Sequence, residues 1–276
     1  MKLDTVVGQR VLITGAAMGM GRIYAERAVE ERAAAVVLWD VNRDALEATA
    51  ESLRAQGGVV HTFVVDLSRR EAIASAAADV RREIGDIDIL FNNAGIVRGK
   101  HYYWEHNAAA DIELTFAVNA LAPMHMAREF LPAMIANQRE SRIVNIASAA
   151  GLVSVPRQSV YGASKWALTG WSDSLRLELE QAGHRHVRVT TVNPTYISTG
   201  MFAGAKPMVM TPIMTPEYVT GRVWRAMKRG TPRVWLPRSV YLSAALKGIL
   251  PLRAFDWMAD RVFGVYRSME SFTGRK

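Results

Sequence analysis

A tyrosine and a lysine four residues apart carry the clearest chemical signal in the sequence. Tyr161 and Lys165 lie in the segment YGASK, and Ser148 precedes the tyrosine by 13 residues. On a helix, residues i and i+4 share a face, so the phenol and the ammonium can point into one site. A phenol titrates near pH ~10, and a nearby cation favours the phenolate and lowers its pKa. Such a tyrosine can exchange a proton with an alcohol or a carbonyl; the alternative is two exposed side chains on an amphipathic helix.

A glycine-rich turn, TGAAMGMG at residues 14–21, follows a short apolar run at 10–14 and precedes a helix expected at 22–33. Glycine lets a backbone approach a pyrophosphate closely, and the amides at a helix N-terminus favour negative charge. We therefore expect the turn to bind a dinucleotide; the alternative is a glycine-rich turn without a ligand. The candidate cofactor-binding residues of the turn are Gly15, Met18, Gly19, Met20 and Gly21.

An aspartate at the end of the second apolar run bears on the choice of cofactor. Asp40 lies 19 residues beyond Gly21. A carboxylate at this distance can accept hydrogen bonds from both ribose hydroxyls of NAD, and it would repel the 2′-phosphate of NADP. Arg22 and Arg43 are the nearby cations that could reverse this preference. We expect NAD rather than NADP; the alternative role for Asp40 is to cap the following helix.

Apolar segments of strand length alternate with segments of helical periodicity as far as residue 192. The expected strands are 10–14, 36–39, 60–65, 87–91, 143–146 and 187–192, and the expected helices are 22–33, 44–55, 71–84, 111–136 and 161–182. This alternation indicates a parallel sheet covered on both faces. We therefore expect the α/β class, with a doubly wound parallel sheet of the Rossmann type in a single domain. Polar residues follow the expected strands at the edge where such sheets bind ligands: Asp40, Asp66, Asn92, Asn93, Ser148 and Asn193.

Further motifs occur in order along the chain. Residues 92–95 read NNAG, Asp66 is followed by Leu67, and Asn119 precedes the serine, tyrosine and lysine described above. Together with the TGxxxGxG pattern of the turn, these motifs make residues 8–195 resemble the short-chain dehydrogenase/reductase family. The resemblance implies a catalytic tetrad of Asn119, Ser148, Tyr161 and Lys165. It also implies cofactor contacts from Asp66, Leu67, Asn93, Ala94, Gly95, Tyr161, Lys165, Pro194 and Thr199.

The resemblance gives each member of the tetrad a role. Tyr161 would exchange the hydroxyl proton, Ser148 would hold the substrate oxygen, and Lys165 would lower the pKa of the phenol and bind the nicotinamide ribose. Asn119 would hold a water that links the lysine to solvent. The alternatives are a buried turn serine and a structural asparagine. Thr195 departs from the family, which usually has glycine after the proline at this point, and we expect a stiffer turn with unchanged chemistry.

Two stretches narrow the resemblance. Residues 148–156 (SAAGLVSVP) and 249–251 (ILP) are similar to a branch that holds microsomal retinol dehydrogenases and lipid-droplet hydroxysteroid dehydrogenases. This similarity implies a lipophilic secondary or allylic alcohol as substrate, or the matching carbonyl. Those relatives carry an N-terminal membrane anchor, whereas this sequence opens close to its first expected strand, so we expect a cytoplasmic protein.

A segment rich in glycine and proline, residues 196–216, reads as a mobile loop. It contains Phe202 and four methionines, at positions 201, 208, 210 and 214. Because methionine adapts to irregular apolar shapes, we expect this loop to cover an apolar substrate. The alternative is that the methionines are plain core residues.

Composition excludes several classes of protein. The 276 residues include no cysteine, which excludes disulfides and thiolate chemistry, and the six histidines are too scattered to suggest a metal site.

The net charge of +8 is concentrated in residues 222–276, which contain 12 Lys and Arg, three carboxylates and many aromatic residues. This segment could complete the substrate pocket and a subunit contact, or it could touch an anionic membrane. We expect no contact with nucleic acid.

The sequence therefore predicts an NAD-dependent oxidoreductase that interconverts a small apolar alcohol and its carbonyl. Two alternatives remain open: a nucleotide-sensing protein without turnover, and a peripheral lipid-surface protein. By analogy with the family, we expect a homodimer or homotetramer formed through the long helices at 111–136 and 161–182.

Overall fold

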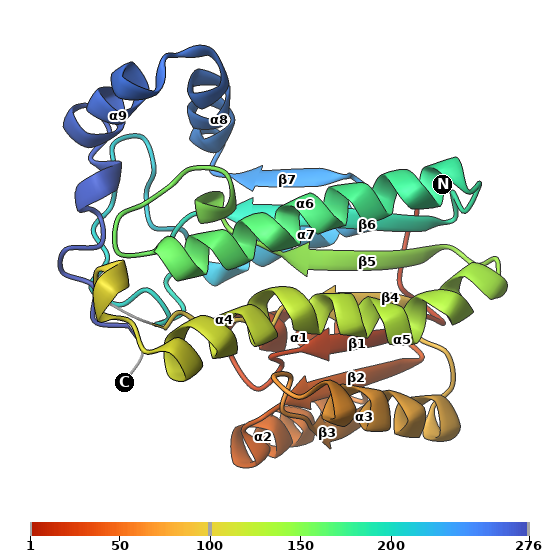
Figure 1. The fold of residues 1–276 in the computed structure, drawn as a ribbon. Coiled ribbons are helices and arrows are strands. Elements are labelled where there is room, and N and C mark those ends of the chain that lie inside the picture. Colours follow the sequence, from red (N-terminus) through yellow and green to blue (C-terminus); the bar gives the residue numbers. More distant parts are fainter. Residues whose placement is uncertain (1, 99–100, 275–276) are drawn as a thin grey trace.

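A computed structural model describes residues 2–98 and 101–274 of the chain (Figure 1). Its centre is a seven-stranded sheet in the order β3-β2-β1-β4-β5-β6-β7, and every strand runs parallel to its neighbours. The strands are β1 (Arg10–Thr14), β2 (Ala35–Asp40), β3 (Val60–Val64), β4 (Ile89–Asn92), β5 (Ser141–Ile146), β6 (Val187–Pro194) and β7 (Arg233–Leu236). The predicted doubly wound parallel sheet is confirmed, with one strand more than the six expected.

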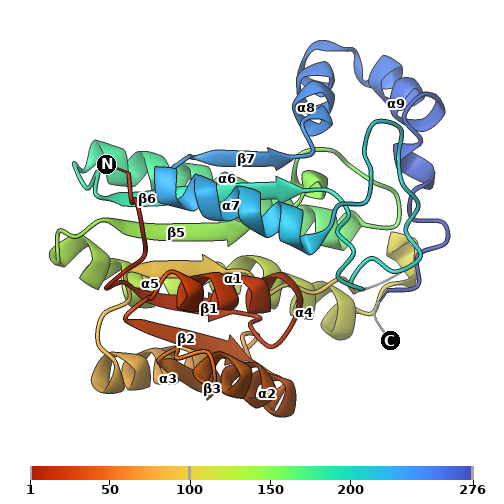
Figure 2. The ribbon, with the colours of Figure 1, turned by 180° about the vertical axis from the view of Figure 1, so that it is seen from behind.

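Helices cover both faces of the sheet, as the continuous burial of the strands requires. The helices are α1 (Gly19–Glu30), α2 (Arg43–Arg54), α3 (Arg70–Glu83), α4 (Leu114–Phe116), α5 (Ala122–Ala136), α6 (Ser159–Gln181), α7 (Pro216–Arg229), α8 (Ser239–Ile249) and α9 (Leu252–Arg261). Helices α4, α5 and α6 lie in front of the sheet in Figure 1, and α1 and α7 lie in front of it in the reverse view of Figure 2.

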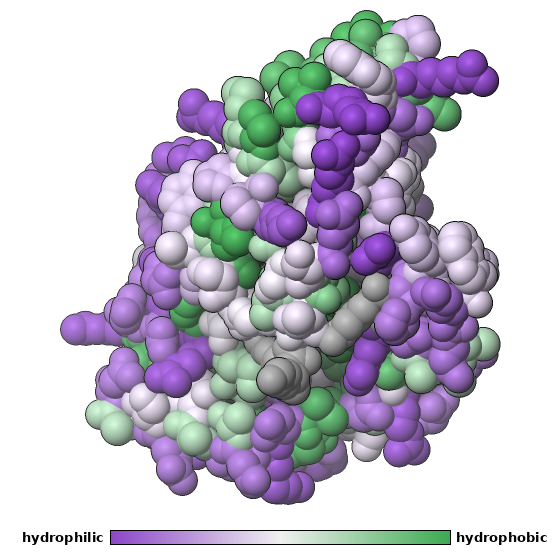
Figure 3. Space-filling view, turned by 90° about the vertical axis from the view of Figure 1, so that its left-hand side faces the viewer, coloured by the Kyte–Doolittle hydropathy of each residue, from purple (hydrophilic) through white to green (hydrophobic). Residues whose placement is uncertain are grey.

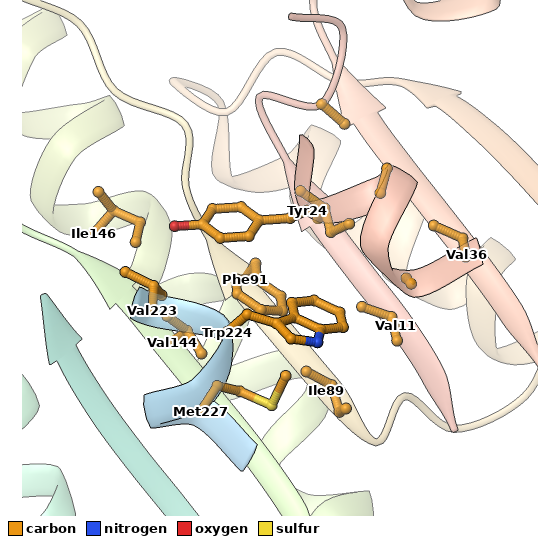
Figure 4. Close-up of a cluster of buried hydrophobic side chains, with 14 of the residues drawn as sticks. Val11, Tyr24, Val36, Ile89, Phe91, Val144, Ile146, Val223, Trp224 and Met227 are labelled. Carbon is orange, nitrogen blue, oxygen red and sulfur yellow. The ribbon is translucent and has the colours of Figure 1, made fainter. Parts of the chain in front are cut away.

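Each face of the sheet has its own apolar core. One core packs β1, β2, β4 and β5 against α1, α2 and α7, and the other packs the opposite faces of the strands against α3, α5 and α6. In the first core Phe91 stacks between Tyr24 and Trp224, with ring centroids 4.6 and 5.7 Å apart (Figure 4). Because β4 carries Phe91 and then Asn92 and Asn93, this packing fixes the strand whose end enters the site.

The long helix expected at 111–136 is not a regular α-helix at its start. It begins with the π-helical turn η2 (Ala108–Glu113), continues through α4, and passes through a second π-helical turn, η3 (Ala117–Leu121), before α5. Such turns are frequent at functional sites because they displace a side chain from its regular position. Asn119 lies in η3 and is fully buried.

The basic segment at the C-terminus is structured rather than a simple tail. Thr215 caps α7 by accepting the Tyr218 N–H at 3.3 Å, and α7 leads through a left-handed Gly230 into β7. Helices α8 and α9 then stand beyond the carboxyl ends of the strands, clear of the sheet (Figures 1 and 2). Among the described residues, none forms a helix long and apolar enough to cross a bilayer.

Candidate active site

The glycine-rich turn joins β1 to α1 and leaves no space for a side chain at Gly15 or Gly21. A Cβ on Gly21 would lie 2.0 Å from the Gly15 carbonyl oxygen, and one on Gly15 would lie 2.9 Å from the Ala94 Cα. Gly15 also adopts a φ of +64°, which L side chains rarely tolerate. The turn therefore keeps its backbone open at the N-terminus of α1, where amides favour an anion.

Polar side chains tie this turn to the neighbouring strand end. The Thr14 hydroxyl accepts the backbone N–H groups of Asn93 and Ala94 at 3.0 and 3.1 Å. In return, the Asn93 side-chain amide donates to the Thr14 and Gly15 carbonyls at 2.9 and 3.2 Å. The NNAG segment and the glycine turn therefore form one unit, and a displacement of either would move both.

Asp40 stands at the end of β2 and has both carboxylate oxygens held by backbone. Its Oδ2 accepts the Ala17 N–H at 3.0 Å, and its Oδ1 accepts the Asn42 N–H at 3.0 Å. The following helix is capped by Asn42, whose side chain accepts the Ala45 N–H, so Asp40 is not the cap that was the alternative. Arg22, one of the two cations near this position, pairs instead with Glu26 at 2.9 Å.

Ser148 and Tyr161 come together from β5 and α6. The Ser148 hydroxyl accepts the Ala150 N–H at 3.1 Å in the turn after β5, and it lies close enough to the Tyr161 phenol to lower the pKa of that phenol. Its backbone carbonyl accepts the Asn193 side-chain amide at 2.8 Å. Asn193 was predicted to lie at the sheet edge, but its role in positioning the serine was not predicted.

Lys165 is buried one helical turn beyond Tyr161. Its ammonium donates to the Ile146 carbonyl at 2.9 Å and lies 5.8 Å from the centroid of the Tyr161 ring. A Cβ on Gly95 would be 3.3 Å from this ammonium, so the lysine also lies against the NNAG segment. The shared helical face predicted from the i, i+4 spacing is confirmed.

Burial sets the proton affinities of both groups. It raises the pKa of Tyr161 to about 12, against the opposing effect of the Ser148 hydrogen bond and with a smaller rise from Tyr196. It lowers the pKa of Lys165 to about 8. Lys165 is not among the groups that shift the pKa of Tyr161 here, so the expectation that it lowers the pKa of the phenol stays a prediction. At neutral pH the phenol is protonated, which suits a proton donor.

Asn119 acts through its side chain on a neighbouring loop. Its Oδ1 accepts the Ile96 N–H, and its Nδ2 donates to the Ile96 carbonyl, both at 2.9 Å. Nδ2 also approaches the Ser164 hydroxyl at 3.2 Å, and that hydroxyl donates to the Tyr161 carbonyl. The side chain thus ties the segment after β4 to α6, and the expected water relay stays a prediction.

A cleft of about 540 Å³ runs along the carboxyl ends of the strands. It brings together most of the predicted site residues: Gly15, Met18, Gly19, Met20, Asp40, Asp66, Leu67, Asn93, Ala94, Gly95, Ser148, Tyr161, Lys165, Pro194 and Thr199. Gly21 and Asn119 are buried outside its lining and act through the backbone turn and through Ile96. Arg98 also lines the cleft and was not predicted from the sequence.

A second, narrower cavity adjoins the cleft at Ser148 and is mostly apolar. Its lining includes Ser148, Gln158, Tyr196, Phe202, Met208 and Met210, with Val240 and Leu242 from α8. Of the four methionines expected over the substrate, Met208 and Met210 line this cavity, Met201 lines the cleft, and Met214 is a core residue. α8 belongs to the segment 222–276, which was expected either to complete the substrate pocket or to touch a membrane, and the cavity lining shows which of its residues lie beside Ser148.

Thr195, where the family usually has glycine, fits the end of β6 without distorting it. Its N–H donates to the Leu236 carbonyl at 2.9 Å, and its side chain lines both the cleft and the apolar cavity. Its hydroxyl oxygen is buried with no hydrogen-bond partner among the described residues. Buried hydroxyls are normally paired, so this one is a candidate contact for a ligand in the cleft or the cavity.

The sequence also matches known proteins. A family model described as short chain dehydrogenase matches residues 9–209. The chain is 39% identical over 275 residues to epidermal retinol dehydrogenase 2 of Mus musculus, covering 98% of this chain and 87% of that protein. It is 39% identical over 249 residues to estradiol 17-beta-dehydrogenase 11 of Homo sapiens, covering 90% and 81%.

Solved structures of similar fold hold either nicotinamide cofactor. A short chain dehydrogenase/reductase from Burkholderia phymatum in complex with NAD superposes with a TM-score of 0.81 at 27% identity, covering 89% of this chain and 95% of that one. A metagenomic short-chain oxidoreductase in complex with NADP superposes with a TM-score of 0.71 at 31% identity, covering 84% and 97%.

Proposed function

Because this chain belongs to the short-chain dehydrogenase family, as its family match and its relatives show, we propose that it interconverts a lipophilic alcohol and its carbonyl with NAD(H) as cofactor. The observation that carries the proposal is the meeting of Ser148 and Tyr161 where the polar cleft joins the apolar cavity. A substrate oxygen bound there would reach both hydroxyls while its carbon skeleton occupied the apolar side.

The residues of the cleft fit a dinucleotide. The turn at Gly15 and Gly21 excludes any side chain, and the amides at the start of α1 would face the pyrophosphate. Asp40 would hold the adenosine ribose, and Lys165, beside Gly95, would hold the ribose next to the nicotinamide. When bound, the cofactor supplies the hydride acceptor or donor, and the protein supplies position and electrostatics.

Tyr161 and Ser148 would handle the proton and the oxygen. In the reducing direction, the Tyr161 phenol would donate its proton to the carbonyl oxygen, and its raised pKa keeps that proton available at neutral pH. The Ser148 hydroxyl would hydrogen-bond the same oxygen as negative charge develops on it. Lys165, mostly protonated below a pKa of about 8, would add positive charge beside the phenol.

Asp40 supports NAD over NADP. Both carboxylate oxygens are fixed by backbone N–H groups, so the negative charge stays at the cleft rim and cannot turn away from a 2′-phosphate. Arg22 is engaged by Glu26 and does not offset that charge. Similar structures hold both cofactors, so the fold alone does not select between them.

The apolar cavity supports a lipophilic substrate. Met208, Met210, Phe202 and Leu242 surround it, and the Tyr161 ring meets the Phe202 ring edge-on with centroids 5.9 Å apart. The similar proteins named above are dehydrogenases of retinol and estradiol, which are apolar alcohols. A sugar alcohol would find few partners for its hydroxyls on such a surface.

A cofactor and substrate panel tests the proposal. The rate of NAD⁺ reduction is measured with retinol, a hydroxysteroid, a medium-chain secondary alcohol and a sugar alcohol, with NADP⁺ in parallel. Turnover of an apolar alcohol with NAD⁺ is the expected result. Tight NADH binding without turnover of any alcohol or carbonyl would instead indicate a nucleotide-sensing protein.

The proposal extends to assembly. The turn η3, which precedes α5, carries the exposed Leu121, and α6 carries the exposed Trp166 and Leu177. We propose that these helices pair between copies in a dimer or tetramer. Molar mass measured by light scattering would test this, and a monomer at micromolar concentration would contradict it.

A further inference from the structure

An exposed apolar surface covers the two helices that stand beyond the sheet. We define the α8–α9 face as Tyr241, Leu242, Ile249, Leu252 and Trp257. Ile249, Leu252 and Trp257 are 80%, 68% and 64% exposed, far more than apolar side chains with a protein partner. Figure 3 shows apolar side chains gathered at the top of this side of the molecule, over α8 and α9, with hydrophilic groups beside them.

The exposed stripe of α8 is uncharged. Tyr241, Ala245 and Ile249 follow one another at four-residue spacing and all face solvent, so they share one side of the helix. The single charged residue within 239–249, Lys247, turns inward, where its ammonium donates to the Leu152 carbonyl at 3.0 Å and lies 4.1 Å from the centroid of the Trp166 ring. Burial of this stripe therefore desolvates no charge.

Cations flank the apolar stripe, and the nearby carboxylates are engaged. Arg238 precedes α8, and Arg253 and Arg261 are exposed on α9 beside Trp257. Asp256 accepts the Tyr266 hydroxyl, and Asp260 pairs with Arg261 and Arg267 at 3.4 and 3.3 Å. Residues 238–261 hold four Lys and Arg against Asp256 and Asp260, so the hairpin keeps a net positive charge even with Arg261 paired, and this charge complements an anionic surface. Tryptophan beside arginine is typical of groups that lie at a lipid headgroup boundary.

The apolar cavity opens beside this face. Leu242 belongs to the face and also lines the cavity. Val209 and Met210, which are 54% and 66% exposed, line the cavity from the facing loop. The Thr211 and Ser239 hydroxyls, 3.2 Å apart, hold that loop against the start of α8. The mouth of the cavity therefore lies between the loop and the helix, in continuity with the exposed apolar surface.

We propose that the α8–α9 face docks on an anionic lipid membrane as a peripheral contact. The apolar stripe would enter the acyl boundary, and the three arginines would lie at the phosphate level. A second copy of the chain fits less well, because a two-fold contact would bring the same arginines of both copies together. As a consequence that rests on the proposed function, a lipophilic alcohol dissolved in the bilayer would enter the cavity without crossing water.

Vesicle flotation of the full chain tests the docking itself and needs no turnover. Wild-type protein is mixed with vesicles of phosphatidylcholine, with and without phosphatidylserine, at low and high salt. It is expected to float with the anionic vesicles at low salt and to be released by salt. Replacing Ile249, Leu252 and Trp257 together by serine is expected to weaken binding at least roughly tenfold, since three apolar anchors are lost.

Each test variant has a matched control elsewhere on the surface. The control for the serine variant combines Val7→Ser, Val59→Ser and Tyr218→Ser, at side chains that are 57%, 54% and 51% exposed, and it should retain vesicle binding. A second test variant combines Arg238→Gln, Arg253→Gln and Arg261→Gln and should weaken binding to anionic vesicles by roughly 100-fold. Its control makes the same change at Arg54, Arg70 and Arg82, on the helices α2 and α3 at the other end of the molecule, and should bind anionic vesicles as the wild type does (Figure 1).

Circular dichroism and NADH affinity are measured for every variant to confirm folding. If the serine variant does not fold, the arginine variant still tests whether this face binds the vesicles. Failure of the wild type to float at low salt would overturn the proposal, and so would equal loss of binding in the matched variants. Sedimentation velocity tests whether a second copy of the chain covers this face instead. If the wild type did not bind vesicles and the serine variant at Ile249, Leu252 and Trp257 dissociated an oligomer, the face would be a subunit interface.

Discussion

Replacing Gly21 by alanine should disable the nucleotide site through one methyl group. The added Cβ would lie 2.0 Å from the Gly15 carbonyl oxygen and 2.8 Å from the Asn93 Nδ2, whereas ordinary contacts are 3.4–4 Å. The nearer neighbour is backbone, so the turn itself must move by more than an ångström. Because Asn93 holds the Thr14 and Gly15 carbonyls, the NNAG segment would move with it.

The magnitude follows from that displacement. A misplacement of about 1 Å in a binding site can cost about 100-fold, so we expect the dissociation constant of NADH to rise roughly 100-fold. Overpacking of this kind should also lower the free energy of unfolding by about 3 kcal/mol. The assays are a fluorescence titration with NADH and thermal unfolding of each variant.

Gly170→Ala is the matched control for this prediction. A Cβ at Gly170 meets nothing within 4 Å in the interior of α6, so alanine there should stabilise the helix by about 1 kcal/mol and leave NADH affinity unchanged. If Gly21→Ala bound NADH as tightly as the wild type, the glycine turn would not be the cofactor cradle.

Three further perturbations test other parts of the site. Since burial raises the pKa of Tyr161 to about 12, alcohol oxidation, which needs the phenolate, should accelerate from pH 7 to 10. Carbonyl reduction, which needs the protonated phenol and the charge on Lys165, should not accelerate over this range, because the pKa of Lys165 is about 8. A flat oxidation profile would argue against this. Asn193→Ala removes the 2.8 Å bond to the Ser148 carbonyl and should lower kcat roughly tenfold with unchanged NADH affinity, whereas weaker NADH binding would indicate a general structural role. Asp40→Ser should raise the ratio of kcat/KM for NADP⁺ to that for NAD⁺ roughly 100-fold by removing like-charge repulsion, and an unchanged ratio would place cofactor selection elsewhere.

Local sequence signals predicted most of the sheet. The apolar runs that became β1, β2, β4, β5 and β6 stand out because both faces of a central strand are buried, and their order follows from alternation with helices. The edge strand β3 was predicted as well, from the longer run VHTFV. β7 was missed because its four residues, RVWL, lie among cations and aromatic residues and end the sheet as an edge strand. A run with only three apolar residues is too short for its periodicity to distinguish a strand from a loop.

The site was predictable where residue identity and spacing carry the chemistry. The i, i+4 spacing placed Tyr161 and Lys165 on one face, but it carried no information on burial, and burial decides the pKa of the phenol. Residue spacing also does not show which residues of α8 lie beside Ser148 in the cavity, because contacts between residues far apart in the sequence depend on the path of the whole chain. Met214 joined the core for the same reason.

The most direct test of the central claim is turnover by Tyr161→Phe with an apolar alcohol or carbonyl that the wild type converts. The variant keeps the ring that packs against Phe202 and loses the hydroxyl that Ser148 engages. Turnover should fall by about 10²–10⁴, with NADH affinity unchanged. Turnover at the wild-type rate would show that Tyr161 is not the proton donor and would contradict the mechanism.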